Sequence, residues 1–243
     1  QVKINQNFCF HNYTKMDVNK ELLVKLLAEL LASFCVQFAG CCVACPVVSY
    51  LPYAVAWGGA VVAATQAFRI VSGAHISPCI TIAALIMEKL GIIESLLYVF
   101  MQLVGSALGF GFAYGFVRHK NSIRFCVTQI TIHPWWKAIL LEFYMTGAWV
   151  LAMCSSWNVA NENMLESISL RIGIVVTAST LAGGGHTGAS MNPFRSLWPA
   201  IADGYWTHFY VFFLVPPITA ALLALAWRYL FLQGDIEQSN EGA

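Results

Sequence analysis

Long apolar stretches, separated by short polar segments, run along most of the chain. Six of them hold about 20 residues, the length that an α-helix needs to cross a hydrocarbon core about 30 Å thick. They cover residues 22–46, 51–70, 95–117, 136–154, 167–184 and 207–231. The pattern predicts an all-α protein with six transmembrane helices.

Two further apolar segments are too short to cross the membrane. Residues 78–88 and 193–202 each begin at a proline. About ten helical residues reach only about 15 Å, half of the hydrocarbon core. We therefore expect two half-helices beside the six spanning helices.

Composition agrees with a membrane protein. Of 243 residues, 58% are hydrophobic and only 10% are charged, whereas soluble domains carry about 25% charged residues. The net charge of +1 gives no support for a nucleic-acid partner. Residues 1–20 are polar, and the apolar run that follows is too long for the core of a signal peptide. The prediction is one membrane domain, 22–231, between polar tails at 1–21 and 232–243.

The basic residues predict an orientation. With the N-terminus inside and Arg195 set apart, eight lysines and arginines fall on the cytoplasmic side and four fall outside. The positive-inside rule favours this arrangement. Both tails are therefore expected in the cytoplasm, and the plasma membrane is the expected location.

The sequence holds eight cysteines. Cys35, Cys41, Cys42 and Cys45 lie in or at the end of one apolar run, without the regular pairs of a zinc site. They are predicted to be buried packing residues rather than members of a disulfide framework. Neither a metal nor a cofactor is expected.

One seven-residue phrase occurs twice. GAHISPC (73–79) and GASMNPF (188–194) are offset by 115 positions, and Glu29 and Glu142, upstream of them, are offset by 113. Each half, about 22–117 and 136–231, then has three spans and one half-helix, so the two halves must cross the bilayer in opposite directions. Inverted repeats of this kind place a site at the midplane, where discontinuous helices meet.

The chemistry of the phrase suits that place. Ser77 and Asn192 are preferred N-cap residues, and Pro78 and Pro193 are favoured at the first helical position. Two opposed half-helix N-termini would each carry roughly +0.5 charge. Such a field repels cations and admits neutral molecules.

These residues resemble the signatures of the aquaporin, or major intrinsic protein, family over about 22–231. The matching positions are Glu29, SGAHISPC (72–79), Gln102, Gly105, Glu142 and TGASMNPFRS (187–196), in which Arg195 follows Asn192 by three. The resemblance implies six helices and two half-helices around one pore per subunit, and a homotetramer. It implies a passive channel for water and small neutral solutes that excludes ions and protons, not an enzyme.

Two departures from the family pattern concern the midplane. Ser77 and Cys79 stand where the family has asparagine and alanine, and Phe194 replaces a second alanine. Serine offers one hydroxyl proton where asparagine offers two amide N–H donors. Weaker ordering of water and weaker ion exclusion are the expected effects.

The resemblance also assigns a selectivity filter to Trp57, Thr180, Ala189 and Arg195. Water-selective members have histidine where this chain has Thr180, so the ring is expected to be wider and suited to glycerol or urea. Ser196 and the lack of a long insertion before the second signature resemble the water-type lineage, an insect branch of which conducts glycerol. A strictly water-selective channel remains the alternative.

The remaining polar residues have two interpretations each. Glu29 and Glu142 are expected to accept hydrogen bonds from the backbone that leads into the half-helices, the alternative being proton transfer. His75 and His186 are expected to fix the same loops, the alternative being pH sensing.

A secondary transporter stays open as another class of protein. Linear, non-saturating flux would distinguish a channel from a transporter.

Overall fold

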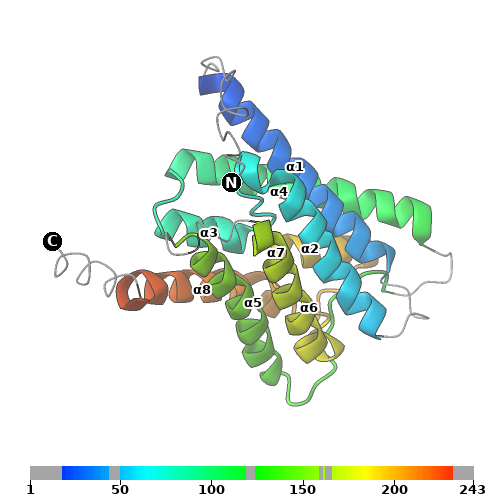
Figure 1. Ribbon diagram of the computed structural model, residues 1–243. Helices are drawn as coiled ribbons and strands as arrows, with labels where there is room; N and C mark the ends of the chain where they lie inside the picture. The colour runs from blue at the N-terminus through cyan, green and yellow to red at the C-terminus, as the bar shows by residue number, and fades with distance from the viewer. Residues whose placement is uncertain (1–17, 44–49, 119–123, 159–160, 162–165, 232–243) are drawn as a thin grey trace, which may run out of the picture.

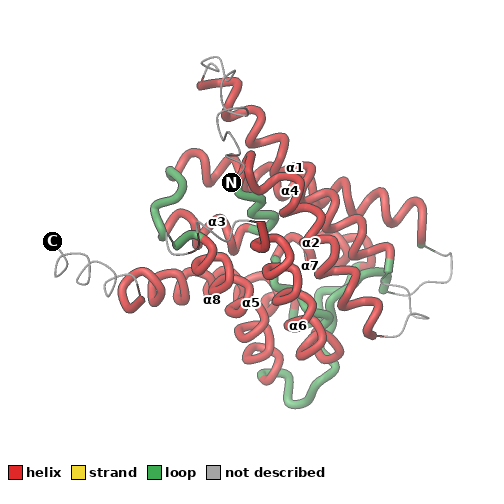
Figure 2. Tube along the Cα trace, in the orientation of Figure 1, coloured by secondary structure: helices red, strands yellow, loops and turns green. Residues whose placement is uncertain are grey.

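The computed structural model describes residues 18–43, 50–118, 124–158, 161 and 166–231 (Figure 1). The helices in chain order are α1 (Val18–Cys42), α2 (Tyr50–Ser72), α3 (Pro78–Ile86), α4 (Ile92–Val117), α5 (Lys137–Ser156), α6 (Ile168–Thr187), α7 (Pro193–Asp203) and α8 (Phe209–Ala226), which continues into a π-helical turn, η3 (Trp227–Phe231). The described part of the chain contains helices and loops and no strand, as Figure 2 shows. The predicted fold class is confirmed.

Six of these helices are long and apolar enough to span a membrane. The first begins at Val18, four residues before the predicted start, because its polar first turn continues the helix beyond the apolar stretch. Lys25 forms an i,i+4 ion pair with Glu21 at 3.1 Å that supports this end. The last spanning helix begins at Phe209, since His208 before it has a left-handed backbone with φ of +53°.

The two repeats pack around a central pair of helices. Helix α1 packs on α4, α5 packs on α8, and α2 crosses α6 between them. At that crossing, a Cβ on Gly58 would lie 2.6 Å from the Gly173 carbonyl oxygen, and a Cβ on Gly173 would lie 2.8 Å from that of Gly58. The positions are 115 apart in sequence, and small residues allow this close approach of membrane helices.

The two half-helices lie inside the bundle and join the repeats (Figure 1). Helix α3 packs against α8, and α7 packs against α4, so each half-helix contacts the last helix of the other repeat. The outer face of the bundle is apolar: Ile70, Ile93 and Phe116 are among the most exposed side chains. Such a surface fits a lipid environment.

The prediction that the cysteines of the first apolar run are buried packing residues is wrong for Cys41, which forms a disulfide, and for Cys35, which is exposed. Cys41 at the end of α1 forms a disulfide with Cys126, 85 positions later, with Cα atoms 5.3 Å apart. Cys126 lies in the described loop that precedes α5, and the disulfide holds this part of the loop at the end of α1. Cys35 is exposed and Cys42 is partly exposed, both as free thiols, and Cys45 lies outside the described residues.

Candidate pore and selectivity filter

The loops that lead into the half-helices share one backbone conformation. Positive φ angles occur at Gly73, Ala74 and Ile76 (+88°, +48° and +64°) and, 115 positions later, at Gly188, Ala189 and Met191 (+83°, +51° and +50°). A non-glycine residue in this left-handed region costs about 1–2 kcal/mol. The surrounding structure must therefore hold both loops in place.

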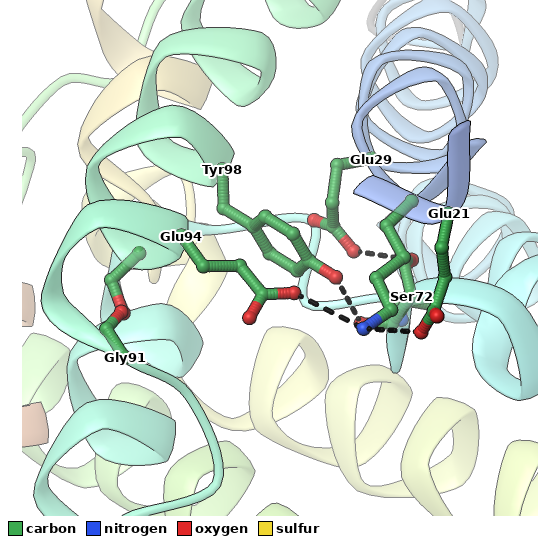
Figure 3. Close-up of polar contacts among 9 residues, drawn as sticks. Glu21, Glu29, Ser72, Gly91, Glu94 and Tyr98 are labelled. Atoms are coloured by element: carbon green, nitrogen blue, oxygen red, sulfur yellow. Dashed lines mark hydrogen bonds and ion pairs between the residues drawn. The ribbon is translucent and has the colours of Figure 1, made fainter. Parts of the chain in front are cut away.

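Glu29 holds the first loop. Its carboxylate is fully buried and accepts four hydrogen bonds, listed here by donor: the Ser72 hydroxyl at 2.7 Å, the His75 N–H at 2.8 Å, the Ile76 N–H at 3.0 Å and the Gln102 amide at 2.8 Å. Figure 3 shows Glu29 facing Ser72, whose carbonyl accepts a further hydrogen bond from Tyr98 at 3.1 Å. All four donors converge on the two carboxylate oxygens.

Glu142 holds the second loop with fewer contacts. It is also fully buried, and one oxygen accepts the Ser190 N–H at 3.0 Å while the other accepts the Met191 N–H at 3.1 Å. The hydroxyl of Thr187 accepts the Ala189 N–H at 3.1 Å. Both acids thus act in this structure as acceptors for non-helical backbone.

The half-helices begin at the repeated proline motifs. Ser77 Oγ accepts the Cys79 N–H at 3.3 Å, and Asn192 Oδ1 accepts the Phe194 N–H at 3.0 Å. A proline occupies the first turn of each half-helix. Asn192 Nδ2 also donates to the Ile76 carbonyl at 3.4 Å, which joins the two repeats near the centre.

A narrow cavity lies between the repeats. It offers about 30 Å³ to a water-sized sphere, enough for two or three waters, since one water needs about 10–15 Å³ of such space. Its walls include Trp57, Val61 and Ile76 of the first repeat and Trp149, Val176, Ala189, Asn192 and Arg195 of the second. Ser77, Cys79 and Phe194 are buried but are not among the described residues around it.

Arg195 is the charged residue of this cavity and is almost fully buried, with 3% exposed. Its Nη1 donates to the Cys126 carbonyl at 2.7 Å, and its Nη2 donates to the Tyr53 hydroxyl at 2.6 Å and to the Gly188 carbonyl at 3.3 Å. The guanidinium carbon lies 4.5 Å from the centre of the Trp57 ring. This cation–π pair forms part of the cavity wall.

Trp57 in turn lies flat against α1. A Cβ on Gly40 would come within 2.5 Å of three atoms of the Trp57 ring, so only glycine fits there with the ring in its present place. The structure therefore brings together Trp57, Ala189 and Arg195, three of the four residues assigned to the filter.

Thr180, the fourth, does not line this cavity. Its side chain is fully buried, and the Tyr50 hydroxyl donates to its carbonyl oxygen. The rings of Tyr50 and Tyr53 stack with centroids 5.8 Å apart. Sequence reasoning missed these two tyrosines; their spacing from Trp57 on the second helix, by seven and four residues, was the signal that could have found them.

The two loop histidines differ in environment. His75 is 4% exposed, its Nδ1 lies 3.3 Å from the Thr81 hydroxyl, and its ring contacts that of Tyr98 with centroids 5.3 Å apart. His186 is exposed, and its carbonyl accepts the Thr131 N–H at 2.9 Å. The first is therefore part of the buried network, and the second contributes through its backbone.

Among the described residues, six helices long enough to span a membrane, two capped half-helices and a narrow cavity between the two halves of the chain are typical of a membrane channel. The family model of the major intrinsic proteins matches residues 16–227. The chain belongs to this family, whose members are channels and not enzymes.

Known relatives agree with this assignment. The chain is 32% identical to aquaporin-5 of Sus scrofa, over 91% of this chain and 86% of the relative. It is 33% identical to the lens fiber major intrinsic protein of Lithobates pipiens, over 74% of this chain and 69% of the relative. The crystal structure of the aquaglyceroporin from Plasmodium falciparum has the same fold, with a TM-score of 0.75, 19% identity and coverage of 87% of this chain and 98% of that one.

Proposed function

We propose that this protein is a passive channel in which water is the principal permeant. The observation that supports this most directly is the cavity of about 30 Å³ between the repeats, narrowed where Arg195 stacks on Trp57. Two or three water molecules fit this space without displacing a side chain. Arg195 and Asn192 supply hydrogen-bond donors along its wall, which replace those that water loses on leaving bulk solvent.

Ion exclusion is part of the proposal. Arg195 brings a fixed positive charge to the constriction, and the capped N-termini of α3 and α7 add a positive potential at the midplane. No carboxylate is among the described residues that line the cavity; Glu29 and Glu142 lie behind its wall, where they accept hydrogen bonds from backbone N–H groups of the two loops. Cations and protons are therefore expected to be repelled.

Glycerol and urea form the second candidate class of permeants. Two assigned filter positions have small side chains, Thr180 and Ala189, and the ring of Trp57 offers an apolar wall to a carbon backbone. Thr180 does not line the cavity, and its carbonyl accepts a hydrogen bond from the Tyr50 hydroxyl. The small volume of the cavity favours water over the larger solutes.

A channel explains the site better than a secondary transporter does. A coupled transporter needs a mid-membrane charged site whose groups can exchange ions or protons. The lone pairs of Glu29 and Glu142 are instead directed at backbone and side-chain donors. These contacts support a structural role for both acids.

The orientation and assembly are also proposals. Disulfides persist in oxidising compartments, so the Cys41–Cys126 bond supports an extracellular position for the segment after α4. Because six spans separate the tails, both termini then lie in the cytoplasm, in keeping with a plasma-membrane protein. We further propose a homotetramer, as the family resemblance implies, which cross-linking in native membranes would test.

Flux through purified protein in liposomes tests the function. Stopped-flow light scattering is expected to show water permeability well above that of protein-free vesicles. The urea and glycerol permeabilities should be smaller, with fluxes that rise linearly with the gradient. Electrical recording in a planar bilayer should show no ion conductance. Saturating flux would support the transporter instead. A measurable cation current through the unmodified protein would contradict ion exclusion.

A further inference from the structure

The hydroxyl of Tyr53 lies between the filter arginine and the second signature loop. Tyr53 is on α2, one helical turn before Trp57. Its oxygen accepts a hydrogen bond from Arg195 Nη2 at 2.6 Å and donates to the Gly188 carbonyl at 2.9 Å. The same Nη2 is 3.3 Å from that carbonyl. Arginine, tyrosine and loop backbone therefore form one closed set of hydrogen bonds.

Counting donors shows what this arrangement leaves for a permeant. A guanidinium has five N–H donors. Three of them are directed at Cys126, Tyr53 and Gly188, while Nε has no partner in the described part of the protein. Nε and the second proton of Nη1 remain available. Tyr53 thus helps to decide which face of Arg195 can bind a passing molecule.

The hydrogen bond between Arg195 and Tyr53 also affects the width of the constriction. Arg195 lies 4.5 Å above the ring of Trp57, and Tyr53 packs edge-on against that ring, with centroids 6.3 Å apart. Without the Tyr53 acceptor, Arg195 keeps the hydrogen bond from Nη1 to the Cys126 carbonyl, while one N–H of Nη2 loses its partner. The guanidinium can then turn away from Trp57, which opens the constriction.

We propose that Tyr53 is a positioning residue that sets the solute specificity of the filter by holding Arg195 against Trp57. The inference rests on the proposed function as a water and solute channel. Losing one hydrogen bond from a charged donor raises the population of displaced conformers about tenfold or more. The ratio of urea to water permeability should therefore depend on the Tyr53 hydroxyl.

Tyr53→Phe in full-length protein, reconstituted in liposomes, tests this dependence. The ring and its packing remain, and only the hydroxyl is lost. We expect the ratio of urea to water permeability to rise at least threefold, towards about tenfold, with water permeability changing less than twofold. Tyr144→Phe is the matched control, because it removes a hydroxyl from an exposed tyrosine of α5 that is not among the residues around the cavity. Its ratio should stay within twofold of the parent.

A double-variant comparison separates positioning from direct contact with the solute. In the Arg195→Val background, Tyr53→Phe should change the ratio by less than twofold, because the residue through which Tyr53 acts is gone. An equal rise in both backgrounds overturns the positioning role. If Tyr53→Phe does not fold, Arg195→Lys tests the contact from the other side, since one ammonium cannot reach both Cys126 and Tyr53; an unchanged ratio there also overturns the proposal.

The outcomes distinguish the inference from the function beneath it. A parent protein without water flux overturns the proposed function, and the inference falls with it. A parent that conducts water, with the same urea-to-water ratio after Tyr53→Phe, overturns the inference alone.

Discussion

Replacing Glu29 by glutamine tests how strongly the first re-entrant loop depends on one carboxylate. Each oxygen of Glu29 accepts two hydrogen bonds. In the variant, the amide nitrogen faces two donors and can accept from neither of them. A hydrogen bond to a charged acceptor contributes about 1.5–3 kcal/mol, so losing two costs about 3–6 kcal/mol of the free energy of unfolding.

The expected loss is smaller than this range suggests, because one of the two donors can turn. Of the two donors that face the amide nitrogen, one is a side chain, either the Ser72 hydroxyl or the Gln102 amide, and it can turn to accept instead. Gln102 Oε1 is buried without a donor among the described residues, which makes this turn favourable. The other donor is a backbone N–H, of His75 or Ile76, which cannot turn. One bond to the charged acceptor is then lost, about 1.5–3 kcal/mol, and the turn gives up a weaker bond, such as that from Gln102 Nε2 to Thr81 Oγ1 at 2.9 Å, about 0.5–1.5 kcal/mol. The expected loss is therefore about 2–4.5 kcal/mol.

Glu142→Gln is the matched control in the second repeat. Each oxygen of Glu142 accepts one backbone N–H, so glutamine removes one such bond, about 1.5–3 kcal/mol. Equilibrium unfolding of the purified variants in mixed micelles of increasing SDS fraction, followed by circular dichroism, measures both losses. A loss for Glu142→Gln that equals or exceeds that for Glu29→Gln would refute the reasoning from the number of hydrogen bonds.

Three further substitutions address the filter and the midplane. Thr180→His adds a ring at a fully buried position that does not line the cavity, so neighbouring side chains must shift, and we expect most water flux to remain while glycerol and urea flux fall at least about tenfold, on the order of 1.4 kcal/mol of barrier; equal glycerol flux in stopped-flow measurements would show that residue 180 has no influence on the filter. Ser77→Asn keeps an N-cap and adds an amide donor, so water permeability should hold or rise, and loss of transport with protein still in the membrane would contradict this. Cys126→Ser frees the segment whose carbonyl binds Arg195, so the urea-to-water permeability ratio should rise. An external reductant should reproduce this rise in the parent but have no effect in the variant, and a parent insensitive to reductant would count against the link.

The fold was largely predictable because its signals are local in sequence. Apolar stretches of about 20 residues define spans by length alone, and proline after a capping residue marks both half-helices, which begin at Pro78 and Pro193 as predicted. The start of α1 was missed because hydropathy cannot detect a polar helical turn outside the apolar stretch.

The missing parts of the site depend on contacts between distant segments. Cys41 and Cys126 are 85 positions apart, and cysteines in an apolar run give no sign of a partner so far away. Tyr50 and Tyr53 reach the second repeat across 130 and 135 positions of sequence. The family resemblance assigns four filter positions. It does not extend to the side chains that hold them, such as Tyr53 beside Arg195.

The contact between Gly40 and Trp57 constrains how this filter can evolve. With tryptophan at 57, any side chain at 40 would meet the ring at about 2.5 Å. The order in which the two positions change therefore matters. A smaller ring must come first, and only then can residue 40 acquire a methyl group; the reverse order passes through an overpacked intermediate, which typically costs about 1–3 kcal/mol. Among descendants of this sequence, we expect a larger residue at 40 only where 57 has already lost its indole.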